Sequence, residues 1–131
     1  MDEGRSTAVA AQLRARATCA AAEAAGQLRG VHALDQAIRA EIAAQPPSLV
    51  PGLRLGEHDV DALVVAEVVA TLGIGAGAAG HLVDLARRVH DDLAGSLSAL
   101  EAGRLDLTRV RVLADLTRDL ATWTAEFTPA V

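Results

Sequence analysis

EHDVDALVVAEVVATLGIGAGAAGHLVDLARRVHDDLAGSLSALEAGR, from Glu57 to Arg104, is the stretch that decides the fold. Three interpretations of its centre compete. Gly75–Gly80 (GAGAAG) matches the G-x-G-x-x-G phosphate-binding fingerprint, which suggests a nucleotide-dependent enzyme. Leu72–Ile74 can form the turn of a helix-turn-helix, which suggests a DNA-binding protein. The third interpretation is plain helical packing, in which small residues let two helices cross closely.

The apolar residues of this stretch recur at three- and four-residue steps, the spacing that places side chains on one face of a helix. Asp59 is the expected N-cap of the first helix, and a break at Gly73 separates it from the second. Gly103 is expected to end a short third helix. The apolar residues on these three faces are Val60, Leu63, Val64, Val68, Leu72, Ala78, Leu82, Leu85, Val89, Leu93, Leu97 and Leu100.

Outside this stretch the pattern is again helical. The pattern of residues 6–44 predicts one long helix with a bend near Gly26 and Gly30. The Pro46-Pro47 pair is expected to end this helix because proline lacks the amide donor. Residues 45–56 form a Pro/Gly loop. The apolar face of the long helix is expected to hold Leu28, Val31, Leu34, Ile38 and Ile42, with Asp35, Arg39 and Glu41 mostly elsewhere.

After Gly103, Asp106 is expected to cap a further helix lined by Val110, Leu113, Leu116 and Leu120. The helical core therefore covers residues 57–121, and residues 122–131 are expected to begin a truncated helix. No period-two alternation is present. The sequence predicts a single all-α domain, a compact helical bundle of about five to six helices with a long N-terminal helix.

Composition narrows the functional classes. The chain has 131 residues, a net charge of −5 and a single cysteine, Cys19, which we interpret as a small packed residue in a cytoplasmic protein. Residues 57–121 carry six arginines against eleven acidic residues, a balance that disfavours generic binding to nucleic acid or to anionic membranes. The longest uncharged run, residues 68–83, is too short and too rich in glycine to span a membrane.

The glycine fingerprint lacks the context that a dinucleotide site requires. A buried parallel strand should precede it, and an acidic residue should end a second strand about twenty residues later. Glu67 and Thr71 interrupt the apolar approach, and Glu101, at the right distance, lies in a helical segment. We therefore interpret Gly75–Gly80 as the start of a helix whose glycines set a close packing distance, and we expect no cofactor.

The helix-turn-helix interpretation is the alternative. The exposed start of its second helix, Gly75–Ala78, offers no side-chain hydrogen bond to base edges. Arg87 and Arg88 lie late in that helix and have acidic residues at helical spacing, which favours ion pairs on a solvated face. The candidate contacts to DNA phosphates are Arg87, Arg88 and a row at seven-residue spacing, Arg104, Arg111 and Arg118.

One pattern of helices and turns extends over roughly residues 60–120. It combines a helix ending in Leu72, an Ala-rich helix, a Leu-rich turn and the run Ala102-Gly103-Arg104-Leu105 before a helix that ends near Thr117. In these features the chain resembles the 13E12 repeat family, whose shared region is catalogued as domain of unknown function 222. Members often carry a C-terminal His-Asn-His nuclease domain and lie in mobile elements. Ala94 stands where that family usually has proline, and the chain contains no asparagine, so no nuclease activity is carried over.

The remaining chemistry is sparse. The clusters His58-Asp59-Asp61 and His90-Asp91-Asp92 flank expected helix ends, where acidic residues are favoured for capping alone, so we expect no metal site and no catalytic residue. The leading hypothesis is a non-catalytic helical module, truncated relative to its relatives. We expect it to self-associate, or to contact a missing C-terminal segment, through Trp123 and Phe127.

Overall fold

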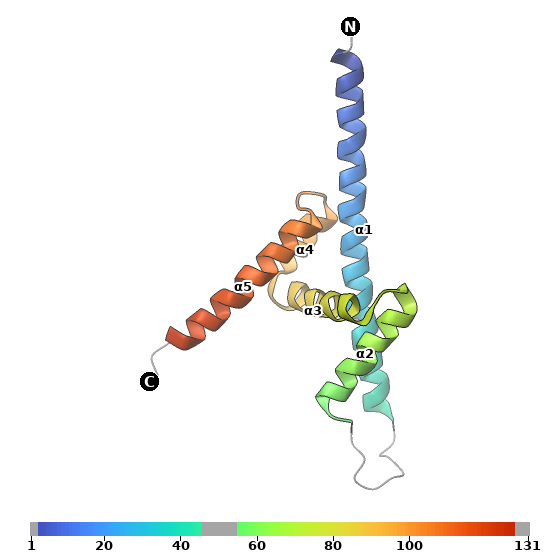
Figure 1. The fold of residues 1–131 in the computed structure, drawn as a ribbon, viewed down its shortest axis with the longest axis vertical. Helices are drawn as coiled ribbons and strands as arrows, with labels where there is room; N and C mark the ends of the chain where they lie inside the picture. Colours follow the sequence, from blue (N-terminus) through green and yellow to red (C-terminus); the bar gives the residue numbers. More distant parts are fainter. Residues whose placement is uncertain (1–2, 46–54, 128–131) are drawn as a thin grey trace. The chain divides into compact units, whose positions relative to one another are not determined.

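The computed structural model describes the backbone of residues 3–45 and 55–127, and the side chains of 4–45 and 55–120. Within these ranges the secondary structure is helical and includes no strand (Figure 1). The all-α prediction is confirmed. The five helices are α1 (Glu3–Ala44), α2 (Glu57–Leu72), α3 (Ala76–Asp92), α4 (Ala94–Glu101) and α5 (Leu107–Phe127).

The long N-terminal helix is confirmed and begins three residues earlier than predicted. Gly26 and Gly30 lie inside α1 without interrupting it. At the other end of the chain, α5 continues without a break to Phe127, so residues 122–127 are the last turns of this helix rather than a separate one. Residues 128–131 lie outside the described part.

The chain divides into two compact units. Gln27–Arg87 forms one, which we call the central unit, and Met1–Gly26 together with Arg88–Val131 forms the other, the terminal unit. The central unit contains the second half of α1, all of α2 and most of α3. The terminal unit contains the first half of α1, the end of α3, and α4 and α5.

In the central unit, α2 buries Val60, Val64 and Val68, which follow one another at four-residue steps. Leu63 and Leu72, predicted on the same stripe, are instead 46% and 37% exposed. The apolar residues of α2 surround almost its whole circumference, so its composition alone does not determine which side is buried. Buried partners on the neighbouring helices are Leu28 and Val31 of α1 and Ala79, Val83, Leu85 and Ala86 of α3.

The connection between α2 and α3 depends on one glycine. Gly73 adopts φ 65° and ψ 32°, the left-handed conformation that glycine reaches without steric cost, and its amide donates to the Val69 carbonyl at 2.9 Å. The break between helices expected at Gly73 is therefore confirmed. From α2 to α3 the helix axis turns through 111°.

At the start of α2 the N-cap is Gly56 rather than the predicted Asp59. The Asp59 carboxylate instead accepts a hydrogen bond from the Gly56 amide at 3.0 Å.

In the terminal unit, α4 and α5 are joined by a tight turn. Gly103, at φ 77°, lies against Thr18 of α1, and a Cβ added to this glycine would approach the Thr18 methyl carbon at 2.5 Å. Asp106 caps α5 as predicted, accepting a hydrogen bond from the Arg109 amide at 2.8 Å. Among the described residues of this unit, the buried ones are Ala21, Ala25, Val89, Leu97, Leu100, Val110 and Ala114.

The prediction of which apolar residues of α5 pack inward is wrong for three of the four. Val110 is buried as expected, but Leu113, Leu116 and Leu120 are 37%, 54% and 62% exposed. Among the described residues of α5, the buried side is formed by Val110 and Ala114, and α4 is in contact with this helix. The larger leucines therefore remain on an uncovered side.

Taken singly, none of the helices in the described ranges is long and apolar enough to cross a membrane.

Candidate functional site

The most unusual residue of the central unit is Asp35, the one polar side chain that is fully buried among those the structure describes, at 1% exposure. It lies on α1, seven residues after the buried Leu28 and seven before the half-buried Ile42. Seven residues are close to two helical turns, so Asp35 shares the inward face with these apolar neighbours. The prediction that placed Asp35 mostly away from this face is wrong.

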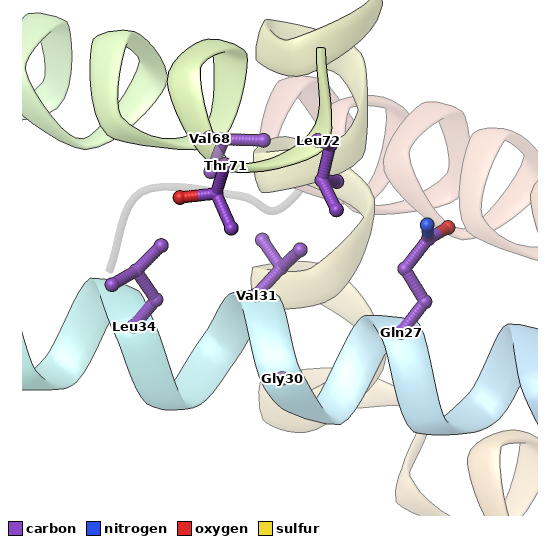
Figure 2. Close-up of a pocket in the computed structure, with 7 residues that line it drawn as sticks. All are labelled: Gln27, Gly30, Val31, Leu34, Val68, Thr71 and Leu72. Carbon is purple, nitrogen blue, oxygen red and sulfur yellow. The ribbon is translucent and has the colours of Figure 1, made fainter. Parts of the chain in front are cut away.

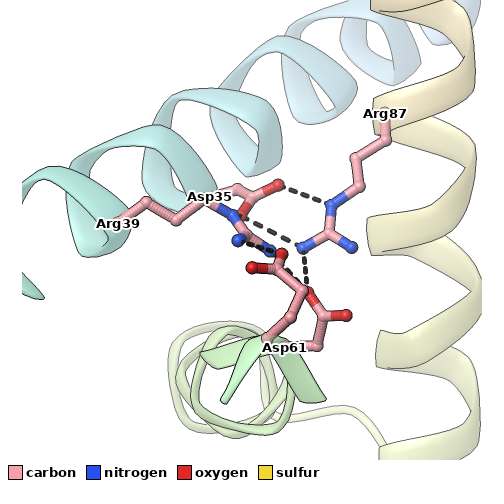
Figure 3. A network of polar contacts seen from close by, with 5 residues as sticks. Asp35, Arg39, Asp61 and Arg87 are labelled. Carbon is pink, nitrogen blue, oxygen red and sulfur yellow. Dashed lines mark hydrogen bonds and ion pairs between the residues drawn. The ribbon is translucent and has the colours of Figure 1, made fainter. Parts of the chain in front are cut away.

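Two arginines donate hydrogen bonds to the buried carboxylate of Asp35 (Figure 3). Arg39, one turn further along α1, donates from Nε to Asp35 Oδ1 at 2.8 Å. Arg87 comes from α3 and donates from Nε to Oδ2 at 2.7 Å and from Nη2 to Oδ1 at 3.2 Å. The Arg87 contact is a two-point pairing of guanidinium and carboxylate, which fixes orientation as well as charge.

Helix α2 completes the network. Asp61 accepts from Arg87 Nη2 at 2.9 Å and also from Arg39 Nη2, so one carboxylate contacts both guanidinium groups. Glu57, at the start of α2, accepts from Arg39 Nη1 at 2.5 Å. The network of Asp35, Arg39, Glu57, Asp61 and Arg87 thus connects α1, α2 and α3, and its exposure increases from Asp35 outward to the largely exposed Glu57.

Charge pairing outweighs burial at the centre of this network. Burial alone would raise the pKa of Asp35, but hydrogen bonds from Arg87 and Arg39, together with their positive charges, hold the pKa below its ordinary value. The pKa of Arg39 is raised, chiefly by its hydrogen bond to Asp35, and the pKa of Arg87 is raised for the same reason. Asp35, Arg39 and Arg87 are therefore each held in their charged form more firmly than the same side chains would be in water.

Two apolar hollows flank α2 in the central unit. The first has a volume of about 320 Å³ and lies between α1 and α2 (Figure 2). Its lining residues are Gln27, Gly30, Val31, Leu34, Val68, Thr71 and Leu72. The second, of about 520 Å³, is lined by His58, Asp61, Ala62, Val65, Ala66, Val69 and Ala76. Neither hollow brings together several polar groups of the kind that orient a small ligand.

The arginines proposed as phosphate contacts occupy different environments. Arg87 belongs to the ion network and is bonded to Asp35 and Asp61. Arg88 is half-buried, and its Nε has no hydrogen-bond partner among the described residues. Arg104, Arg111 and Arg118 are exposed.

The glycine-rich segment is the start of α3, as predicted, but its glycines do not set a packing distance. A Cβ added at Gly75, Gly77 or Gly80 would meet no atom within 4 Å. The expectation that these glycines let α3 approach α2 is therefore wrong, because the space beside them is open. Close approach in the described chain occurs instead at Gly103.

The other candidates from the sequence are not gathered into a site. Cys19 is exposed, contrary to the interpretation as a packed residue, because α1 has no described side chain buried before Ala21. Across the described residues, no group of three or more His, Cys, Asp or Glu side chains is arranged to hold a metal ion. The side chains of Trp123 and Phe127 lie outside the described part, so the contact predicted for them stays a prediction.

Two uncovered helix faces remain in the terminal unit. On α5, Val112, Leu113, Leu116 and Leu120 are all exposed, between 37% and 62%. On α1, Val9 and Leu13 are 47% and 63% exposed, and each described side chain from Gly4 to Ala20 is exposed.

The chain matches no protein-family model, no curated protein and no solved structure.

Proposed function

We propose that this chain is a non-catalytic helical docking module of the cytoplasm, akin to the N-terminal region of 13E12 repeat proteins, and that it binds another protein through an apolar face of α5. The observation that carries the proposal is the exposure of Val112, Leu113, Leu116 and Leu120 on one helix. Single exposed leucines are common on protein surfaces, but four large apolar residues at helical spacing form the kind of stripe that a partner helix covers.

The ion network supports a structural role for the central unit. General acid–base catalysis needs a group whose pKa lies near the working pH. The pKa of Asp35 is moved downward and those of Arg39 and Arg87 upward, in each case away from neutrality. A buried carboxylate held by arginines from two helices specifies how α1, α2 and α3 fit together, a recognised use of buried polar groups.

DNA binding is the second candidate, because the 111° turn and the left-handed Gly73 match the geometry of a helix-turn-helix. Two features weigh against it. The start of α3 exposes Ala76, Gly77 and Ala78, which carry no side-chain donor or acceptor for base edges. Arg87 is engaged by Asp35 and Asp61. We expect no duplex binding at 150 mM salt, and affinity that falls steeply with salt would favour the DNA-binding candidate instead.

The docking proposal is tested by site-specific photo-crosslinking in cells. A photoreactive phenylalanine at Leu116 is expected to form a protein adduct of discrete mass. The matched control is the same probe at Arg111, which is exposed on another side of α5. Equal labelling at the two positions, or none at Leu116, would overturn the proposal, because a docking face must be contacted more often than its opposite side.

A further inference from the structure

The terminal unit has two apolar stripes that differ in the size of their side chains. On α5, Val112, Leu113, Leu116 and Leu120 make a bulky stripe. On α1, the exposed residues Val9, Leu13, Ala17 and Ala20 follow one another at steps of four, four and three, which places them on one face. Two alanines make this second stripe shallow, so it suits a partner helix with large side chains.

The charges that border the two stripes have opposite sign. From Gly4 to Ala22, α1 carries three arginines and no acidic residue. Arg5 lies one turn before Val9, and Arg16 lies between Leu13 and Ala20 at helical spacing, so both border the shallow stripe. All of these side chains are exposed.

On α5 two acidic residues lie along one edge of the stripe, whereas Arg109, one turn before Val112, is paired with Asp106. Asp115 and Asp119 are four residues apart and follow Val112 and Leu116 by three residues each, which places them along one edge of the bulky stripe. Both carboxylates are exposed. A helix presenting this stripe would therefore bring its leucines against the alanines of α1 and its acidic edge against Arg5 and Arg16.

From this complementarity we propose that the partner of the docking face is a second copy of the chain, with α5 of each copy lying on the first half of α1 of the other. The inference rests on the proposed docking function and names its partner. Both stripes are exposed within a single chain, and a two-fold pairing covers both at once. An interface of this kind closes at two copies and leaves neither stripe to recruit a third.

The first measurement is the mass of the full chain by sedimentation equilibrium across a concentration series. We expect a dimer, and we expect the paired variant Leu116→Glu with Leu120→Glu to be monomeric with unchanged helicity by circular dichroism. The matched control is Leu63→Glu, which changes a leucine of α2 that is 46% exposed in the central unit. A monomer at all concentrations, or a dimer that survives the paired variant, would refute the inference.

The pairing of α1 with α5 is tested by charge reversal. One variant carries Arg5→Glu with Arg16→Glu, and the other carries Asp115→Arg with Asp119→Arg. Each alone places like charges at both contacts of a homodimer, so its dissociation constant should rise at least tenfold. Mixed in equal amounts, the two should form a heterodimer of near wild-type affinity, because both contacts then join opposite charges.

The outcome of mixing decides the geometry. If the reversed variants stay monomeric together, α1 does not contact α5 of the second copy and the inference fails. The photo-crosslink at Leu116 separates this failure from that of the docking function. An adduct with the mass of two chains supports the dimer, whereas an adduct of another mass retains the docking face and refutes the second copy as its partner.

Discussion

Asp35→Asn is the substitution that most directly tests the role assigned to the ion network. It removes the negative charge that faces two guanidinium groups while it preserves the size of the side chain. One amide oxygen can still accept from Arg39 or Arg87, but the amide nitrogen, itself a donor, then faces the other arginine. Two positive charges are left close together around a site that is 1% exposed.

The expected cost follows from the remaining contacts. Removing one partner of a fully buried ion pair costs about 3–5 kcal/mol. Here the side chains of Arg39 and Arg87 are 26% and 27% exposed, and both retain Asp61. Partial hydration and the second carboxylate offset part of the loss, so we expect the free energy of unfolding to fall by about 2–3 kcal/mol.

The matched control is Glu57→Gln, which neutralises another carboxylate bonded to the same Arg39. The side chain of Glu57 is 77% exposed, and exposed pairs contribute at most about 1 kcal/mol. Urea denaturation followed by circular dichroism at 222 nm gives both values. If the two substitutions cost the same within error, burial of Asp35 does not determine the strength of the network, and the reasoning is wrong.

Further predictions concern pH and the glycines. The pKa of Asp35 in the folded protein is below its ordinary value of 3.8. The stability that its charge provides is therefore fully present above about pH 4 and is lost as the pH falls through the folded pKa. In acid titrations, the difference in unfolding free energy between wild type and Asp35→Asn should accordingly shrink. Gly73→Ala should destabilise by about 1–2 kcal/mol because φ is positive there, whereas Gly80→Ala, in open helical space, should stabilise by about 0.5–1 kcal/mol in the same urea assay. Gly103→Ala combines positive φ with the approach to Thr18, so its thermal midpoint should fall further than that of Gly73→Ala, and adding Thr18→Ala should recover only the part due to the clash.

Local signals in the sequence were sufficient for most of the secondary structure. The helix ends at Gly73 and Gly103 and the cap at Asp106 were predicted because each depends on residues within one or two turns. The long α1 was predicted because no proline interrupts it before Pro46. These features need no knowledge of tertiary contacts.

The ion network was missed for the opposite reason. Arg87 is 52 residues from Asp35, and a search at helical spacing instead pairs it with acidic residues of its own helix. One signal was available, since Asp35 stands between Leu28 and Ile42 at seven-residue steps and therefore on the apolar face. The exposed leucines of α5 were misassigned because periodicity identifies an apolar side without showing whether the chain itself covers it.

The first turns of α1 have a consequence for amide hydrogen exchange. From Gly4 to Ala20 every described side chain is exposed, whereas Ala21 and Ala25 are buried. In the monomeric variant Leu116→Glu with Leu120→Glu, no second copy covers this segment. Backbone amides before Ala21 should then be protected by little more than the local equilibrium between helix and coil, and they should exchange rapidly from the N-terminus onward. Amides after Ala21 should exchange far more slowly, within the same uninterrupted helix. One helix would thus contain a gradient of protection whose steepest change marks where tertiary packing begins.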